Sequence, residues 1–381
     1  MEIGVPKEIK NHEYRVGLTP YGVKTLCDAG HKVFIEKDAG KAIDFANDMY
    51  IDAGAEITDS AQRVYQCDLV IKVKEPQPEE VNLLSRGQVL FTYLHLAADR
   101  QLLDALLKTG VIAIAYETVR DAAGRLPLLT PMSEVAGRLA IQAGASTLQM
   151  ANGGRGVMLG GVPGVMPAKV VIVGGGVVGT QAAKMAIGLG ADVTLLDNNI
   201  ERLRYLDDVY GPALKTRYSD ASAIKELTQQ ADLVIGAVLI AGKQAPRLIT
   251  REHIKAMQAG SVLVDVAIDQ GGCAETSKPT THQQPTYVVD DVVHYCVTNM
   301  PGACARTATM ALTNATMPYV MALANKRYQK ALLDDKGFMA GLSMHLGQLT
   351  CVDVAQDMQM SCLLPQDVLS TDPSDRTAIV V

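Results

Sequence analysis

The sequence has no tryptophan, only four phenylalanines and no C-x-x-C pair among its seven cysteines. An odd number of scattered cysteines argues against a disulfide framework or a thiolate metal site, and it favours a reducing, cytoplasmic compartment. No run of about 18 apolar residues occurs, so no membrane span is expected. The charged, strand-like start MEIGVPKEIK is unlike a signal peptide. A net charge of −6 gives no reason to expect nucleic acid or an anionic membrane as a partner.

Two features of the sequence are informative, its length and a group of regularly spaced glycines. At 381 residues the chain exceeds one compact core, which favours two domains. Near its middle a β-branched run leads into Gly174, Gly176 and Gly179 at G-x-G-x-x-G spacing. A helix-like stretch and a second apolar run, which ends on Asp197, follow.

This strand–helix–strand pattern is typical of a dinucleotide-binding unit. The first glycine permits the tight turn, the second lets the backbone approach a pyrophosphate, and the third lets the helix pack close to the sheet. The helix N-terminus then faces the phosphates. Asp197 is placed to accept hydrogen bonds from a ribose and to repel a 2′-phosphate, so it favours NAD over NADP. The alternative is a glycine-rich turn in an ordinary α/β domain.

Strand-like and helix-like stretches alternate on both sides of this unit, which predicts an α/β fold with parallel sheets. Strands are expected at 2–5, 33–36, 69–73, 89–94, 111–116, 233–238, 262–266 and 287–289, and helices at 21–28, 79–84, 99–108 and 305–329. We expect two domains, an inserted Rossmann dinucleotide-binding domain at 131–305 and a discontinuous, Rossmann-like outer domain. The outer domain comprises 1–130 and a helical completion at 306–381, whose tail from Pro365 is expected to fray. Three domains are the alternative.

Polar residues follow several of these strands, at the edge where open α/β sheets bind ligands. Lys74, His95 and Glu117 each follow a strand of the outer domain, Asp269 follows one in the Rossmann part, and Arg15 lies in the first loop. Each alone has an ordinary explanation, such as a solvated lysine, a half-buried histidine, an ion pair, a loop anchor or a turn residue. Their equivalent places in the topology favour a functional cleft between the two domains.

With these residues in view, the chain resembles the NAD-dependent alanine dehydrogenases, within the family that also holds the nucleotide-binding part of transhydrogenase. The resemblance covers nearly the whole chain. It is carried by MEIGVPKEIKNHEYRVGLTP, IKVKEP, FTYLHLA, AYETV, PMSEVAGRLAIQ, GGGVVG, DVAIDQGGCAETSKPTTH and HYCVTNMPGA. It implies reversible oxidative deamination of L-alanine to pyruvate and ammonium, with hydride transfer to NAD, by a homohexamer.

The resemblance also implies which residues contact the cofactor. They are Ser133, Gly174, Gly176, Val177, Val178, Gly179, Asp197, Arg202, Ser219, Val238, Leu239, Val266, Ala267, Ile268, Asp269, Lys278, Val297, Thr298, Asn299 and Met300. No metal is expected, because Ala322 and Lys326 stand where a metal is sometimes assigned in the family.

For the chemistry, the resemblance implies that Arg15 and Lys74 bind substrate and that His95 and Asp269 act as acid and base. A guanidinium suits bidentate binding of the substrate carboxylate, and a lysine adds a point charge. Hydride loss requires a neutral amine and leaves an iminium, which water attacks. Histidine is a common proton carrier in enzymes, so His95 can carry those protons, while Asp269 could orient the amine or the water.

Three other functions stay open. A soluble transhydrogenase-type subunit would leave His95 unexplained. A saccharopine-type or other amino-acid dehydrogenase of the same family would need a different substrate pocket. A catalytically idle NAD-binding regulator is hard to reconcile with Arg15, Lys74 and His95. The partners that we expect are the small molecules L-alanine, pyruvate and ammonium, whereas a transhydrogenase-type subunit would present NAD(H) to a membrane partner.

Overall fold

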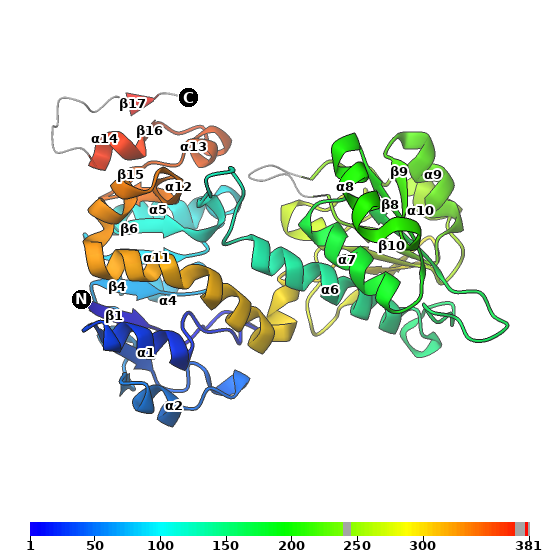
Figure 1. Ribbon diagram of the computed structural model, residues 1–381. Coiled ribbons are helices and arrows are strands. Elements are labelled where there is room, and N and C mark those ends of the chain that lie inside the picture. Colours follow the sequence, from blue (N-terminus) through cyan, green and yellow to red (C-terminus); the bar gives the residue numbers. More distant parts are fainter. Residues whose placement is uncertain (239–244, 370–377, 380–381) are drawn as a thin grey trace. The chain divides into compact units, whose positions relative to one another are not determined.

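The computed structural model describes residues 1–238, 245–369 and 378–379 (Figure 1). The chain divides into two compact units. Unit 1 comprises Met1–Met132 and Cys304–Val381, and unit 2 comprises Ser133–Ala303. In the described part of the chain, no helix is long and apolar enough to cross a bilayer.

Unit 1 is built on an eight-stranded sheet in the order β15-β14-β6-β5-β4-β1-β2-β3. Strands β1 to β6 pair in parallel, and β14 pairs antiparallel with β6 and β15. The strands are β1 Glu2–Val5, β2 Lys32–Glu36, β3 Glu56–Thr58, β4 Leu69–Ile71, β5 Val89–Thr92, β6 Ile112–Ala115, β14 Leu342–His345 and β15 Gln348–Leu349. The main helices are α1 Pro20–Asp28, α2 Asn47–Asp52, α3 Ala61–Val64, α4 Pro78–Val81, α5 Arg100–Thr109 and α11 Ala305–Asp334.

Unit 2 has a seven-stranded sheet in the order β12-β13-β11-β10-β7-β8-β9, in which only β12 is antiparallel among the described strands. The strands are β7 Lys169–Val173, β8 Asp192–Asp197, β9 Lys215–Tyr218, β10 Leu233–Gly236, β11 Val262–Asp265, β12 Thr286–Val289 and β13 Val292–Tyr295. The helices are α6 Thr130–Thr147, which begins in unit 1, α7 Val177–Gly188, α8 Ile200–Tyr210, α9 Ala221–Gln230 and α10 Arg251–Ala256. Counted along the chain, the parallel strands of both units follow the doubly wound order 3-2-1-4-5-6, which confirms the Rossmann-like fold class.

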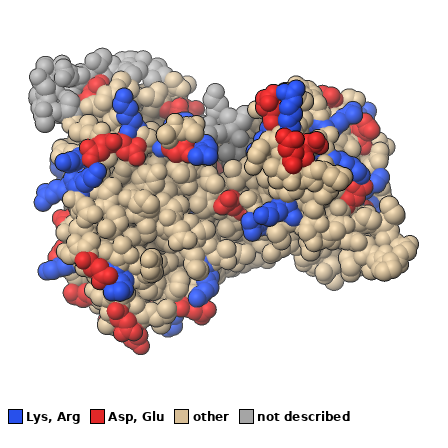
Figure 2. Space-filling model, in the orientation of Figure 1, with Lys and Arg blue, Asp and Glu red and all other residues tan. Residues whose placement is uncertain are grey.

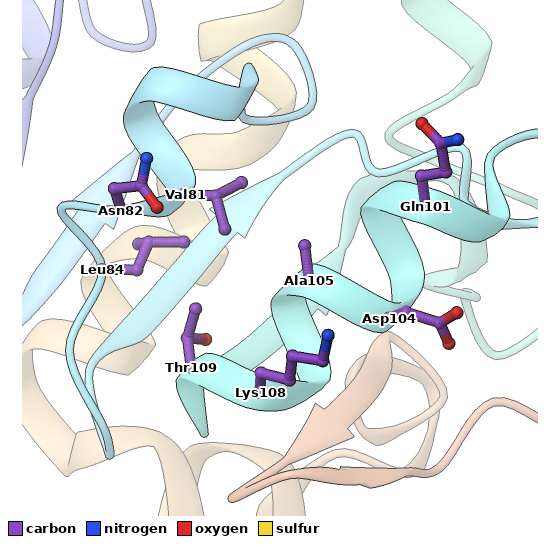
Figure 3. A pocket seen from close by; sticks show the side chains of 8 residues that line it. All are labelled: Val81, Asn82, Leu84, Gln101, Asp104, Ala105, Lys108 and Thr109. Carbon is purple, nitrogen blue, oxygen red and sulfur yellow. The ribbon is translucent and has the colours of Figure 1, made fainter.

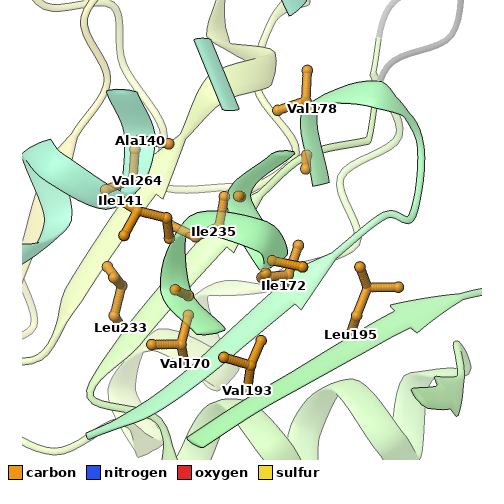
Figure 4. Packing of buried hydrophobic residues seen from close by; sticks show 14 of the residues in the cluster. Ala140, Ile141, Val170, Ile172, Val178, Val193, Leu195, Leu233, Ile235 and Val264 are labelled. Carbon is orange, nitrogen blue, oxygen red and sulfur yellow. The ribbon is translucent and has the colours of Figure 1, made fainter. Parts of the chain in front are cut away.

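The core of unit 2 shows why apolar runs form these strands. Val170, Ile172, Leu233, Ile235 and Val264 are fully buried on the face of the sheet that α6 and α7 cover (Figure 4). The strand residues between them pack into a second buried cluster. A strand buried on both faces must be apolar throughout, so the continuous β-branched runs are the expected signature.

The ends of a helix can also be explained from the residues that stand there. Helix α5 begins at the N-cap Asp99, whose carboxylate accepts the N–H of Leu102 at 3.0 Å. It ends at Gly110, which adopts a left-handed conformation with φ 69°. Leu103 and Leu106, two residues of this helix, are fully buried.

The helical completion predicted for residues 306–381 contains helices but also strands that the prediction missed. Strands β14 and β15 join the sheet of unit 1, between α12 (Lys336–Met339) and α13 (Val352–Met358). The prediction that the tail frays from Pro365 is wrong for its first residues, because α14 (Pro365–Leu369) buries Val368 and Leu369. Further on, β17 (Ala378–Ile379) pairs with β16 (Cys362–Leu363). Residues 370–377 and 380–381 lie outside the described part.

Candidate functional site

Gly174, Gly176 and Gly179, in the turn after β7, are glycines for different physical reasons. Gly174 has φ 106°, and a Cβ on it would lie 2.8 Å from the carbonyl oxygen of Ala237. A Cβ on Gly179 would lie 1.8 Å from the carbonyl oxygen of Gly174. Clashes with the protein's own backbone therefore explain why Gly174 and Gly179 carry no side chain.

Gly176 has no such internal reason. Its backbone has φ −65° and ψ −162°, an extended conformation that other residues adopt, and a Cβ on it would meet no atom within 4 Å. It is also the N-cap of α7, where helix N–H groups and the helix dipole attract anions. The turn thus has an open surface that a side chain would fill, and this surface fits the pyrophosphate of a dinucleotide.

Asp197 and Arg202 both hold this turn in place. The Asp197 carboxylate accepts the N–H of Gly175 at 2.6 Å and that of Asn199 at 2.8 Å. Arg202 donates from Nε to the carbonyl of Gly175 and from Nη2 to the hydroxyl of Thr180, both at 2.6 Å. Asp197 therefore lies at the end of β8 beside the glycine turn, as its position in the sequence predicts, and its role toward a ribose stays a prediction.

Most of the other predicted cofactor residues of unit 2 follow the carboxyl ends of its parallel strands. Val177 and Val178 begin α7 after β7, Ser219 follows β9, Val238 follows β10, Val266 to Asp269 follow β11, and Val297 to Met300 follow β13. Ser133 lies in α6, and Lys278 is exposed in a later loop. Leu239 lies outside the described residues. One edge of the sheet thus gathers the strand-end residues from elements that lie far apart in the sequence.

Asp265 is a buried residue of this edge that the sequence analysis missed. Its side chain is fully buried at the end of β11 and accepts the N–H groups of Ala267, Cys273 and Ala274 at 2.8 to 3.2 Å. It also accepts the hydroxyl of Ser277 at 2.5 Å. These bonds fix the short 3-10 helix Val266–Gln270 that carries Asp269, whose carboxylate accepts the N–H of Asn299 at 3.3 Å.

In unit 1, Lys74 and His95 follow the adjacent strands β4 and β5. Glu75 follows Lys74 directly in the chain and pairs with Lys10. Burial by itself would raise the pKa of Glu75, but Lys74, Lys10 and His95 outweigh this effect, so the pKa is lowered. Lys74 and His95 therefore both lie close enough to act on one half-buried carboxylate.

Arg15 is buried and held by a residue that the sequence analysis did not name. Its Nε and Nη2 donate to the two carboxylate oxygens of Glu13 at 2.7 and 2.5 Å, and its Nη1 faces the sulfur of Met132 at 3.0 Å. Burial opposes the charge of Arg15, but the Glu13 carboxylate more than compensates, so the pKa of Arg15 is raised. Glu13 fixes the plane of the guanidinium, and the spacing of two residues is a local signal that could have identified the pair.

Glu117 anchors the loop that carries His95. Its carboxylate accepts the N–H groups of Leu94 at 3.1 Å and of His95 at 2.6 Å. His95 itself has a left-handed backbone, with φ 50° and ψ 36°, and its ring stacks against Tyr93 at a centroid distance of 5.7 Å. A conformation that is uncommon for a non-glycine residue is thus maintained by hydrogen bonds donated to a carboxylate that follows the neighbouring strand.

A pocket of about 550 Å³ lies between α4 and α5, and Figure 3 shows that its lining includes Val81, Leu84, Asp104 and Lys108 but none of the predicted site residues. Basic and acidic side chains are interspersed over the face drawn in Figure 2. No group of three histidine, cysteine, aspartate or glutamate side chains in the described part could hold a metal ion.

Comparison with known proteins decides the family. The models of the N-terminal and C-terminal domains of alanine dehydrogenase/PNT match residues 4–136 and 140–352. An alanine dehydrogenase from Halomonas elongata is 58% identical over 93% of this chain and 96% of its own length. One from Bacillus subtilis is 54% identical, over 98% of this chain and 99% of its own. The chain belongs to the alanine dehydrogenase/PNT family.

Solved structures agree with this assignment. An L-alanine dehydrogenase that is 54% identical superposes with a TM-score of 0.91 over 94% of this chain and 99% of its own. A transhydrogenase from Sinorhizobium meliloti, 24% identical, has a TM-score of 0.78 over 92% of this chain and 98% of its own, and it shows a shared fold. Arg15, Lys74 and His95 fall within the N-terminal domain match and the glycine turn within the C-terminal one. The family resemblance expected from the sequence is confirmed, and the chain is a dehydrogenase-family protein with a dinucleotide-binding domain.

Proposed function

We propose that this protein is an NAD-dependent L-alanine dehydrogenase, which converts L-alanine and water to pyruvate and ammonium and runs reversibly. The observation that carries the proposal is the combination of two features in one chain. Charged residues suited to an amino acid follow β4, β5 and β11, and the chain is 52 to 58% identical to relatives named alanine dehydrogenase.

The cofactor assignment is supported by the open surface at Gly176 and by Asp197 beside it. NAD, when bound, accepts the hydride from the substrate. The α7 N-terminus would bind the pyrophosphate, and the Asp197 carboxylate would disfavour a 2′-phosphate by charge repulsion. Arg202 supports the same turn from the next helix, α8.

Lys74 and Arg15 are the proposed carboxylate-binding residues. Lys74 provides a point charge at the end of β4. Glu13 engages Nε and Nη2 of Arg15 and the Met132 sulfur lies at Nη1, so Arg15 is proposed to attract the substrate carboxylate through its positive charge. A fixed carboxylate directs the Cα–H bond of the substrate, and small errors in that direction are costly.

His95 is the proposed proton carrier, because the amine must be neutral before hydride leaves and water must lose a proton afterwards. Glu117 accepts the backbone N–H of His95, which fixes the backbone from which the imidazole extends. Asp269, on the 3-10 helix after β11, is the proposed group that orients the amine or water and stabilises the cationic iminium.

The test is a spectrophotometric assay of NADH formation, first with L-alanine and then with other amino acids. Turnover with L-alanine well above that with other substrates supports the proposal. Turnover only with a larger amino acid would indicate another dehydrogenase of the family. NADH binding without any turnover would instead support the transhydrogenase-type or regulatory alternative, neither of which explains the charged group around Lys74 and His95.

We further propose a cytoplasmic homohexamer. All seven cysteines lie in the described residues and are free thiols, which supports a reducing compartment. Light scattering coupled to size-exclusion chromatography measures the assembly, and a mass other than six times 40.7 kDa would refute the hexamer.

A further inference from the structure

A group of buried charged side chains surrounds Lys72, two residues before Lys74, and the mechanism above does not use it. The Lys72 side chain is fully buried, and its ammonium donates to Glu8 Oε2 at 3.1 Å and to Glu80 Oε1 at 2.6 Å. The hydroxyl of Tyr65 donates to the same Glu80 oxygen at 2.9 Å. One cation thus faces two carboxylates in the interior of unit 1.

Glu8 differs from Glu80 in what its second oxygen does. Oε1 of Glu8 accepts the N–H of Val73 at 2.7 Å and that of Lys74 at 3.3 Å. Strand β4 has ended at Ile71, and β1, its neighbour in the sheet, has ended at Val5. N–H groups beyond the end of a neighbouring strand lose their sheet acceptor and need another. The Glu8 carboxylate therefore takes the place of the missing strand.

The other side of this peptide is held by β5. The carbonyl of Val73 accepts the N–H of Tyr93 at 3.3 Å, and the carbonyl of Lys74 accepts the hydroxyl of Thr92 at 2.9 Å. Glu8 supplies the acceptor for both N–H groups. The backbone from which the Lys74 side chain extends is thus fixed on two sides, and on one of them by a single carboxylate.

The charge on Glu8 matters to this arrangement, because an ionised acceptor makes stronger hydrogen bonds than a neutral one. Burial raises the pKa of Glu8, and Lys72 acts against this rise. Lys72 therefore favours the ionised form in which Glu8 binds the two N–H groups.

We propose that Glu8, paired with Lys72, is a positioning residue that fixes the Lys74 backbone and so directs the Lys74 ammonium to the substrate carboxylate. This inference rests on the proposed function, in which Lys74 binds that carboxylate. Glu8 acts through Lys74 and has no contact with substrate in this scheme.

The matched variants are Glu8→Gln and Glu80→Gln. Each substitution removes one of the two carboxylates that pair with Lys72, but only Glu8 contacts the backbone of Val73 and Lys74. We expect Glu8→Gln to lower kcat/KM for L-alanine about 10- to 100-fold, mostly through KM, as the loss of charge-assisted hydrogen bonds predicts. The NADH Kd should stay within about twofold. Glu80→Gln should lower the melting temperature but leave the KM for L-alanine within about threefold.

A double-mutant cycle with Lys74→Ala separates positioning from general destabilisation. If Glu8 acts through Lys74, Glu8→Gln should reduce kcat/KM less than about threefold further in the Lys74→Ala background. Equal losses in both backgrounds would overturn the proposal, as would a KM increase of the same size in Glu80→Gln. If Lys74→Ala has no measurable turnover, Lys74→Gln, which also removes the cation, serves as the second background.

The two proposals fail in different ways. Turnover unchanged in Lys74→Ala would refute the role of Lys74 and with it the proposed carboxylate site. A large loss in Lys74→Ala without coupling to Glu8 would refute only the positioning role. If Glu8→Gln does not fold, Glu8→Asp keeps the charge beside Lys72 but retracts the carboxylate by one methylene. It should show the same KM increase, and an unchanged KM would contradict the proposal.

Discussion

Gly176→Ala separates cofactor binding from folding at the glycine turn. The backbone at Gly176 is compatible with alanine, and the added methyl group would meet no atom within 4 Å. A glycine-to-alanine change at such a position stabilises a protein by about 0.4 to 1 kcal/mol, because the unfolded chain loses freedom. We therefore expect a melting temperature that is unchanged or higher by about 1 to 4 °C.

The same methyl group should weaken dinucleotide binding. It would stand on the surface assigned to the pyrophosphate, where the backbone of Gly176 would otherwise be in contact with the ligand. An extra methyl group in a close contact costs about 1 to 3 kcal/mol. At about 1.4 kcal/mol per factor of ten, the NADH Kd should rise about 10- to 100-fold.

Gly179→Ala is the matched control, with the opposite expectation for stability. Its methyl group would lie 1.8 Å from the carbonyl oxygen of Gly174 and 3.2 Å from Cγ2 of Ile172. Backbone must shift to relieve the first contact, so we expect a loss of about 3 kcal/mol or more. That corresponds to a fall in melting temperature of about 6 to 12 °C.

Calorimetric titration with NADH and thermal unfolding without ligand measure the two quantities for each variant. A Gly176→Ala protein that binds NADH within threefold of the unmodified protein would refute the placement of the pyrophosphate at this turn. A melting temperature that falls in Gly176→Ala as it does in Gly179→Ala would instead contradict the open space that the structure shows.

Three further changes test other residues. His95→Ala should lower kcat about 10²- to 10⁴-fold, or about 3 to 5 kcal/mol of barrier, with NADH binding intact; turnover within tenfold would remove His95 from the mechanism. Asp197→Ser should narrow the ratio of kcat/KM for NAD over NADP, because it removes the charge that repels a 2′-phosphate; an unchanged ratio would mean that the ribose is recognised elsewhere. Asp265→Ala leaves several buried donors without their acceptor, so urea unfolding should show a loss of about 3 kcal/mol or more, and a loss below about 1 kcal/mol would contradict this account.

Central strands such as β4 and β10 could be predicted because they are buried on both faces and are therefore apolar. Two of the strands that the prediction missed, β14 and β9, lack such an apolar run. β14 reads LSMH, and its Ser343 and His345 are buried polar residues whose contacts are made by the tertiary fold. β9 reads KTRY and is an edge strand with largely exposed residues, which a search for apolar runs passes over. Edge position and buried polar pairing are properties of the assembled sheet.

The residues of the candidate site were accessible from the sequence for a related reason. Parallel strands bring their carboxyl ends to one edge, so Lys74 and His95 could be grouped from strand positions alone. The same argument placed Glu117 at this edge of the sheet. It could not identify the backbone N–H groups that the supporting carboxylates accept, because Glu8 lies 65 residues before Val73 and Glu117 lies 22 residues after His95. An acidic residue at such a distance has no periodicity or spacing that links it to its partner.

The supporting carboxylates of both units share one physical role. A parallel strand that extends past its neighbour leaves N–H groups without a sheet acceptor, and such groups must be paired. Glu8 and Glu117 pair them after β4 and β5, Asp265 accepts the N–H of Ala267 after β11, and Asp197 accepts that of Gly175 in the glycine turn. A carboxylate is the strongest side-chain acceptor for this purpose and can bind two N–H groups at once. Glu8 and Asp265 are buried, and Glu117 and Asp197 are half-buried. The backbone after each strand is thus held by a carboxylate that is not assigned to bind the substrate.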